Sequence, residues 1–322
     1  MKILTLTKLP EEQVTALNNA GYEVIHAAIR DLSDAELVDI DIIYGVDEFL
    51  NDILLHILEL PNHKLKWLQV VSAGVNYLPL KELQAAGVQV TNASGVKAKP
   101  IAQTVLAFLL SFARSVNTYE HIHTWNEQTD QYLIDELHIA VFGTGNIGKQ
   151  VATYLNAFGA DVIGISRSGR TSPEFMSNYK IDDAPDALAK HKIDVVINTL
   201  PGTDETRHYF DDAFFTAQPL FAFINVGRGS TVAQRDLIAA LKNGQVRFAG
   251  LDVTSPEPLP DDNELWTFEN VILTQHTSWG EHANKGRRFG KSDLFEIFFA
   301  NAPTFITNQT LVKNAVDLTK GY

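Results

Sequence analysis

Cysteine is absent from this chain of 322 residues, which excludes disulfide bonds, a cysteine nucleophile and thiolate metal ligands. No apolar run approaches the roughly 18 residues that a membrane-spanning helix needs, so we expect no membrane partner. The first strand-like run begins at Lys2. Because this leaves no room for a signal peptide, we expect a cytoplasmic protein.

Basic residues are also scarce. Lys and Arg total 26 against 39 Asp and Glu, a formal net charge of -13 that would repel a polyanion. The longest basic stretch, Lys285 to Lys291, holds four cations that a helix would spread around its surface. We therefore expect neither a nucleic acid nor an anionic membrane as a partner.

What is present is typical of a globular protein, with 45% hydrophobic and 20% charged residues. The length exceeds that at which a single core usually stops growing, which favours two domains. Short apolar runs alternate with helix-like segments, and this pattern predicts a parallel sheet with helices on both faces. In the first series we expect strands at residues 3–6, 23–25, 40–44, 68–71 and 88–91.

A second series follows a long helix that we expect to open at Pro100, because a missing N–H costs nothing at the first helical position. We place a domain hinge just before it, near Val96 to Lys99. A further helix is expected from about Lys291, with an irregular tail after it. Between the two helices we expect six strands, the number in a full dinucleotide-binding sheet, at residues 139–142, 162–165, 195–200, 223–226, 248–251 and 271–274.

The strand ending at Phe142 leads directly into a glycine-rich turn, after which apolar residues recur at helical spacing. The glycines of such a turn allow a tight bend, close approach of the backbone to pyrophosphate, and close packing of helix on strand. A turn without a ligand is the alternative, but the context favours a dinucleotide cofactor. The turn comprises Gly143, Thr144, Gly145, Asn146, Ile147 and Gly148.

The end of the next strand indicates which cofactor is bound. An NAD site usually carries an acidic residue there, whereas this chain has Ser166, Arg167 and Ser168. Arg167 can pair with a 2′-phosphate, which a carboxylate would repel. Asp161 lies before the strand, at the opposite end of the sheet. The pattern favours NADP, with NAD as the alternative.

Three residues at successive strand ends suit the reduction of a 2-keto acid. This chemistry needs a cation for the carboxylate, a proton donor for the carbonyl oxygen, and a group that holds the donor. Arg228, Glu257 and His276 fit these needs, and Glu257 stands between two prolines that stiffen its loop. Taken singly, Arg228 could cap a helix, Glu257 could be a solvated loop charge and His276 could be a core histidine. Together, the three residues predict a catalytic set.

A metal site is not expected. His121 and His123 alternate in a polar stretch, but no third ligand lies near them in the sequence.

These motifs resemble the D-2-hydroxyacid dehydrogenase family from end to end. The residues that carry the resemblance are Ser72-Ala73-Gly74-Val75, the glycine-rich turn, Leu200-Pro201 with Glu205-Thr206, Asn225 to Gly229, Gly250 to Val253 followed by Pro256 to Pro260, and His276-Thr277-Ser278-Trp279.

The resemblance implies an α/β fold of two doubly wound parallel-sheet domains, Rossmann-like and flavodoxin-like, with an active-site cleft between them. A discontinuous substrate domain would comprise residues 1–98 plus 288–322, and residues 99–287 would form the NAD(P)-binding domain. Arg228 would bind the substrate carboxylate with Ser72, Ala73 and Gly74, His276 would be the acid/base, and Glu257 would support it. Beyond the glycine-rich turn, the cofactor would contact Ser166, Arg167, Ser168, Leu200, Pro201, Thr206, Val226, Gly227, Asp252, His276 and Ser278.

Within the family, the serine-arginine segment and Trp279 are similar to the glyoxylate/hydroxypyruvate reductase branch, which implies NADP, a homodimer and reduction of a small 2-keto acid. Two positions depart from the family pattern: Gln275 stands where proline is common, and Gln103 where glutamate is frequent. Neither departure removes a catalytic group, although we expect Gln275 to affect how rigidly the His276 side chain is oriented.

Two other functions stay open. The fold can serve as a non-catalytic nicotinamide-binding sensor or interaction protein, against which the intact catalytic set argues. Oxidation of a one-carbon acid such as formate would need further polar residues around a small pocket, and the sequence offers none. Substrate preference is expected to depend on first-domain loops, including Tyr44 to Phe49 and Tyr77.

Overall fold

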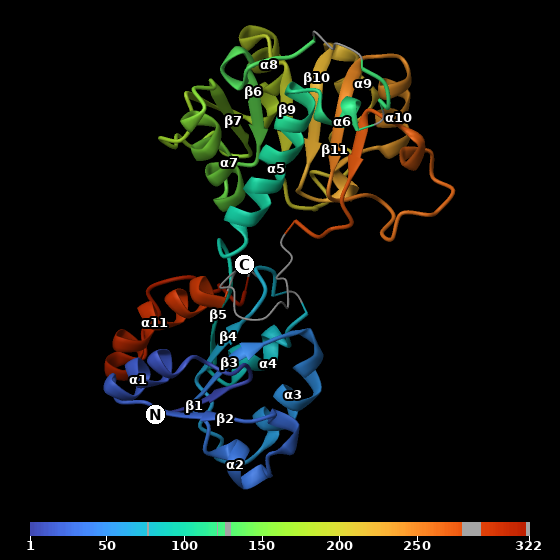
Figure 1. The fold of residues 1–322 in the computed structure, drawn as a ribbon. Coiled ribbons are helices and arrows are strands. Elements are labelled where there is room, and N and C mark those ends of the chain that lie inside the picture. Colours follow the sequence, from blue (N-terminus) through green and yellow to red (C-terminus); the bar gives the residue numbers. More distant parts are fainter. Residues whose placement is uncertain (76, 121, 126–129, 279–290, 320–322) are drawn as a thin grey trace. The chain divides into compact units, whose positions relative to one another are not determined.

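The computed structural model describes residues 1–75, 77–120, 122–125, 130–278 and 291–319 (Figure 1). The chain forms two compact units, Met1–Val96 with Glu281–Tyr322, and Lys97–Gly280. The first unit is thus built from both ends of the sequence. The domain limit predicted at residues 287 and 288, and the basic stretch up to Gly290, lie outside the described residues.

The first unit contains, within the described residues, one sheet of five parallel strands in the order β2-β1-β3-β4-β5. Each expected strand of the first series is present. Their bounds are β1 (Lys2–Thr5), β2 (Glu23–His26), β3 (Ile42–Val46), β4 (Trp67–Val70) and β5 (Gln89–Thr91).

Helices cover both faces of this sheet. On one face lie α2 (Asp34–Val38), α3 (Asn51–Glu59) and α4 (Leu80–Ala85). The other face packs against α1 (Glu11–Asn19) and α11 (Lys291–Asn308). There the ring of Trp67 stacks on Phe298, with centroids 4.4 Å apart. Burial of aromatic side chains therefore attaches the C-terminal helix to the unit that begins the chain.

The second unit has a sheet of seven parallel strands in its described residues, ordered β12-β11-β10-β9-β6-β7-β8. The prediction of six strands was therefore wrong by one. The bounds are β6 (Ile139–Phe142), β7 (Val162–Ser166), β8 (Ser177–Lys180), β9 (Val195–Asn198), β10 (Leu220–Asn225), β11 (Val246–Leu251) and β12 (Val271–Leu273).

The missed strand is β8, with the sequence Ser-Asn-Tyr-Lys. Among the described residues it lies at the edge of the sheet and pairs with β7 alone, and none of its four residues is fully buried. An edge strand of this kind needs no apolar run, because one side faces solvent. The pattern used for the buried strands therefore could not find it.

Successive residues of the central strands face opposite helical layers. Ile139 and Val141 pack against α5 (Ala98–Ala113) and α7 (Asn146–Ala157). Ala140 and Phe142 pack on the opposite side, where the helices are α8 (Ala184–His191), α9 (Asp212–Ala217) and α10 (Gln234–Lys242). The expected doubly wound α/β architecture with parallel sheets is confirmed.

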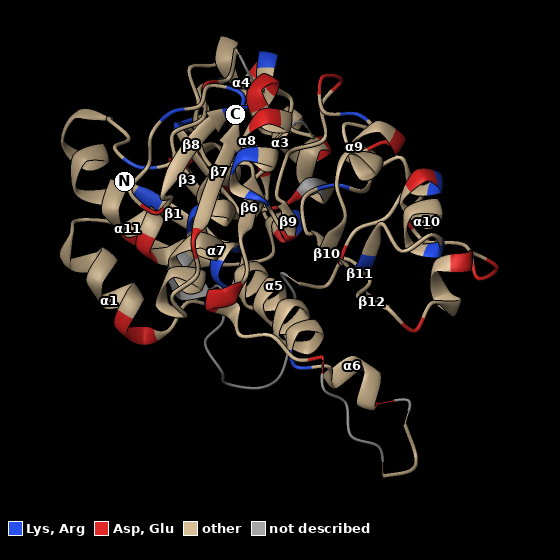
Figure 2. Ribbon diagram, turned by 90° about the horizontal axis from the view of Figure 1, so that it is seen from above, with Lys and Arg blue, Asp and Glu red and all other residues tan. Residues whose placement is uncertain are grey.

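The hinge helix α5 begins at Ala98, two residues before the predicted start. Pro100 thus lies within the first turn, where its missing N–H still has no helical partner to lose. Figure 2 shows α5 almost free of charged residues, consistent with its eight buried residues. Among the described residues, no helix combines the length and the apolar character needed to cross a membrane.

Candidate active site

The glycine-rich turn joins β6 to α7, and each of its glycines has a different surrounding. Gly143 has a φ of 95°, and a Cβ added there would lie 2.6 Å from Thr199 Oγ1. A Cβ on Gly148 would lie 1.9 Å from the Gly143 carbonyl oxygen, so only glycine lets the helix pack this closely. Around Gly145 nothing lies within 4 Å of the added atom. This open space at the N-terminus of α7 fits a pyrophosphate.

The order of the strands reverses between β6 and β9, and the carboxyl ends of these two strands are where an open α/β sheet binds its ligand. Leu200 and Pro201 follow β9 at this edge. The Thr206 hydroxyl donates to the Pro201 carbonyl at 2.6 Å, and Thr203 N–H donates to the same hydroxyl at 2.9 Å. Thr206 therefore shapes the loop that the family resemblance assigns to the cofactor.

Strand β7 ends at Ser166, which places Arg167 and Ser168 at the same edge of the sheet. The Ser166 hydroxyl is buried and has no hydrogen-bond partner in the described part of the chain. Such an orphan group fits a ribose or phosphate oxygen. Asp161 precedes β7 and lies at the opposite end of the strand, as expected.

The sequence analysis did not anticipate that Glu205 would interact with Arg167. The Thr203 hydroxyl and, less strongly, the charge of Arg167 hold the pKa of Glu205 below its usual value. Glu205 is fully exposed, so this interaction is screened by solvent.

Arg228 follows β10 and is exposed. Its carbonyl oxygen accepts hydrogen bonds from the Thr231 hydroxyl at 2.6 Å and from Asn225 Nδ2 at 3.2 Å. A Cβ on Gly227 would lie 2.6 Å from the Leu200 carbonyl oxygen. The arginine turn and the loop after β9 therefore pack against each other.

A buried amide cluster beneath these two loops was missed by the sequence analysis. Asn198 Nδ2 donates to Asn225 Oδ1 at 2.8 Å and to the Thr231 hydroxyl at 2.7 Å. Its Oδ1 accepts from Leu200 N–H at 2.9 Å. All three polar side chains are at most 1% exposed. The only signal in the sequence was an asparagine inside each of the predicted strands 195–200 and 223–226, and in the structure these asparagines end β9 and β10.

The histidine and glutamate expected to form a pair do so. His276 Nδ1 lies 2.9 Å from Glu257 Oε2, and their side chains are 39% and 37% exposed. Since an ionised carboxylate only accepts hydrogen bonds, Nδ1 is the donor, which leaves Nε2 for another partner. The second carboxylate oxygen of Glu257 accepts from Thr254 N–H at 2.9 Å.

Asp252 organises the turn that carries the histidine. It is 3% exposed, and its Oδ1 accepts from the Thr274 hydroxyl at 2.6 Å and from the N–H groups of Thr277 and Ser278 at 3.0 and 3.2 Å. His276 itself has a φ of 55°, and its N–H donates to the Asp252 carbonyl at 2.7 Å. The aspartate therefore supports a backbone conformation that few residues other than glycine adopt.

Strand order places the three predicted catalytic residues at one edge of the sheet. Strands β10, β11 and β12 are neighbours in the sheet, and Arg228, Glu257 and His276 follow them in this order at their carboxyl ends. The buried Ser278 hydroxyl beside this edge has no hydrogen-bond partner among the described residues. The other expected substrate residues, Ser72, Ala73 and Gly74, follow β4 in the first unit and are partly or fully exposed.

Residues 106–278 match the family model described as "D-isomer specific 2-hydroxyacid dehydrogenase, NAD binding domain". The chain belongs to this family. It is thus an NAD(P)-dependent oxidoreductase that acts on CH–OH groups.

Three relatives illustrate the range of this dehydrogenase family. A glyoxylate/hydroxypyruvate reductase B from Citrobacter koseri is 32% identical over 84% of this chain and 83% of its own length. A crystal structure of phosphoglycerate dehydrogenase from Lactobacillus plantarum is 34% identical, with a TM-score of 0.56 over 98% of this chain and 100% of the other. An NADPH-dependent glyoxylate/hydroxypyruvate reductase from Sinorhizobium meliloti, in complex with NADP and sulfate, is 25% identical, with a TM-score of 0.70 over 100% and 99%.

In the described part of this dehydrogenase, no group of three or more His, Asp or Glu side chains could hold a metal ion. His123 is exposed there. Two other residues named in the sequence analysis, His121 and Trp279, lie outside the described residues.

Proposed function

We propose that this dehydrogenase reduces a small 2-keto acid to the D-2-hydroxy acid, with NADPH as the reductant. The observation that carries the proposal is the His276–Glu257 pair at 2.9 Å, at the same edge of the sheet as Arg228. A cation and an oriented imidazole at one edge of the sheet suit a substrate that carries a carboxylate and a carbonyl group.

His276 is the proton donor in this proposal. Glu257 accepts from Nδ1 and orients the ring, so Nε2 of a protonated His276 can donate to the substrate. Transfer of this proton from Nε2 to the carbonyl oxygen, together with addition of a hydride at the keto carbon, would convert the C=O bond into a CH–OH group. In the oxidation direction, neutral His276 takes the same proton back.

Arg228 holds the substrate carboxylate. A guanidinium binds both carboxylate oxygens through two parallel hydrogen bonds, which fixes the orientation of the attached carbonyl group. The same proposal assigns the N–H groups of Ala73 and Gly74 to the binding of the substrate carboxylate. When bound, NADPH would supply the hydride for the keto carbon and leave as NADP+.

Two features support NADP over NAD. The strand end that would meet the ribose carries Arg167 between two serines, and the Ser166 hydroxyl there is an orphan. The Sinorhizobium relative is a complex with NADP. Gly143, Gly145 and Gly148 would hold the pyrophosphate, and Ser278 would lie at the nicotinamide end.

The substrate class that we propose is glyoxylate or hydroxypyruvate, after the Citrobacter and Sinorhizobium relatives. The Lactobacillus relative makes phosphohydroxypyruvate a further substrate to assay. We also propose a cytoplasmic homodimer. Val116, Trp125 and Leu133 are apolar side chains exposed along one segment, Trp125 to 95%, and burial against a second copy would remove them from water.

The test is oxidation of NADPH and of NADH, followed by absorbance, with glyoxylate, hydroxypyruvate, pyruvate, phosphohydroxypyruvate and bulkier 2-keto acids. His276→Ala is expected to lower kcat about 10²- to 10⁴-fold, the usual contribution of a general acid, while NADPH binding stays. NADPH binding without turnover of any acid would instead support the sensor function.

A further inference from the structure

The substrate loop of the first unit presents two backbone donors. Ala73 and Gly74 are exposed, and neither N–H group donates a hydrogen bond to another described residue. In a trans peptide unit the carbonyl oxygen and the following N–H point in opposite directions. Whatever holds the carbonyl groups of Ser72 and Ala73 therefore aims the N–H groups of Ala73 and Gly74.

Both carbonyl groups are held by the segment that follows β5. Ala93 N–H donates to the Ser72 carbonyl oxygen at 2.8 Å, and Asn92 Nδ2 donates to the Ala73 carbonyl oxygen at 2.9 Å. Asn92 is 8% exposed. The orientation of the two free donors thus depends on where Asn92 and Ala93 lie.

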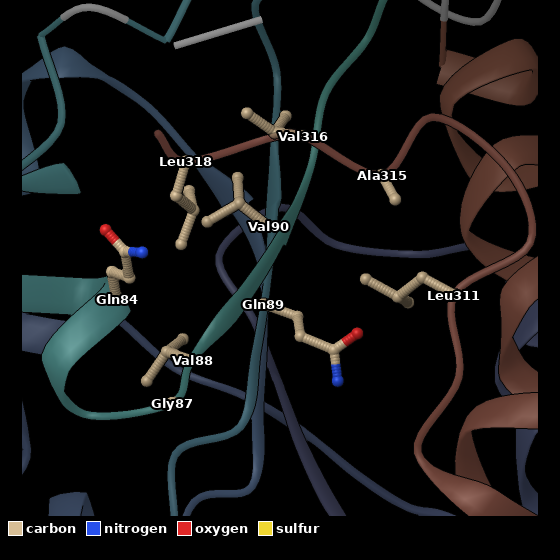
Figure 3. A pocket seen from close by; sticks show the side chains of 9 residues that line it. All are labelled: Gln84, Gly87, Val88, Gln89, Val90, Leu311, Ala315, Val316 and Leu318. Carbon is tan, nitrogen blue, oxygen red and sulfur yellow. The ribbon is translucent and has the colours of Figure 1, made fainter. Parts of the chain in front are cut away.

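That position is set by the C-terminal tail. Asn314 Nδ2 donates to the carbonyl oxygens of Asn92 and Ser94 at 3.1 and 2.8 Å, and Asn92 N–H donates back to the Asn314 carbonyl at 3.1 Å. Asn314 has a φ of 56°, a conformation that asparagine tolerates better than most residues. Figure 3 shows the tail beside β5, where Val316 N–H donates to the Val90 carbonyl.

The tail is in turn fixed to α11 by a fully buried asparagine. Asn301 Oδ1 accepts from the N–H groups of Val312 and Lys313, and its Nδ2 donates to the Lys313 carbonyl at 2.9 Å. Burial makes these hydrogen bonds costly to break. A continuous series of contacts therefore runs from α11 through the tail to the substrate loop.

We propose that Asn314 is a positioning residue of the substrate site, acting through Asn92 to aim the Ala73 and Gly74 N–H groups at the substrate carboxylate. This inference rests on the proposed function. It assigns to the last part of the chain a role in binding the keto acid, although the catalytic set lies in the other unit.

The test compares three variants. Asn314→Asp keeps the size and the left-handed backbone but loses both donors, and Asn314→Gly keeps the backbone alone. Gln309→Gly is the matched control, because Gln309 is another left-handed residue of the tail, with a φ of 57°, and its side chain is exposed.

We expect both Asn314 variants to raise the KM for the keto acid roughly fivefold to tenfold, the effect of one misplaced hydrogen bond. The kcat and the KM for NADPH should stay within twofold of the unaltered protein.

Hydrogen exchange of the Ala93 amide supplies a readout that does not require turnover. It should quicken in Asn314→Asp and stay unchanged in Gln309→Gly, because that amide is bonded to Ser72. An unchanged KM for the keto acid in Asn314→Asp overturns the inference, even where exchange quickens. Parallel losses of kcat and NADPH binding would also overturn it, since they indicate general unfolding. Absence of turnover in the unaltered protein would refute the proposed function. In that case, an unchanged exchange rate of the Ala93 amide in Asn314→Asp would separately refute the positioning role.

Discussion

Gly229 lies directly against the backbone of Thr254. A Cβ added to Gly229 would lie 1.7 Å from the Thr254 carbonyl oxygen and 2.8 Å from Ser255 N. The next residue after the arginine thus packs on the loop whose Thr254 N–H holds Glu257. A side chain at position 229 would displace the loop that holds Glu257. The distance between Arg228 and the His276–Glu257 pair therefore depends on residue 229 being glycine.

Gly229→Ala should therefore lower kcat by more than tenfold, because the 254–257 loop must move and a displacement of about 1 Å at a catalytic group can cost on the order of 100-fold. NADPH affinity, measured by fluorescence titration, should change little. Gly244→Ala is the control: it lies in the exposed turn between α10 and β11 with open space around it, although its φ is 79°. The control should lose some thermal stability and keep its kcat. Equal kcat values in Gly229→Ala and the unaltered protein would contradict the coupling.

Cofactor preference should depend on Arg167 and Glu205 in opposite ways. Arg167→Ala should raise the KM for NADPH roughly tenfold to a hundredfold, the loss expected for a charge-assisted hydrogen bond, with little effect on NADH. Glu205→Gln removes a negative charge that acts on Arg167 and should improve the KM for NADPH about twofold to fivefold, less at high salt. Steady-state kinetics with both cofactors measure the two ratios. A preference for NADH in the unaltered protein would refute this assignment.

The buried amide cluster should matter for both stability and binding. Asn198→Ala removes the donor to Asn225 Oδ1 and to the Thr231 hydroxyl, and it leaves the buried Leu200 N–H without an acceptor, at a cost of about 1–3 kcal/mol. We expect a lower midpoint of thermal unfolding and weaker NADPH binding, since the loop after β9 loses its anchor. Asn243→Ala is the control, because Asn243 is exposed and caps a surface turn. Equal melting temperatures for the two variants would show that the cluster carries no net stability.

Local patterns in the sequence predicted much of this architecture. The glycine-rich turn was identified because Gly143, Gly145 and Gly148 each meet a requirement set within a few residues. Likewise, Arg228, Glu257 and His276 each follow a run of apolar residues, and parallel strands bring their carboxyl ends to one edge. Where the signal was weak, as in the polar edge strand β8, the prediction failed.

What the sequence by itself determined is the alternation of strands and helices, the cofactor turn and the residue types at the strand ends, because these depend on spacing along the chain. Only the tertiary structure decided that Asp252 shapes the histidine turn, that Asn198 joins two loops and that Asn314 meets Asn92. The last pair is separated by 222 residues. Hydrogen bonds between such distant residues depend on how the strands order and the helices pack, which no local pattern encodes.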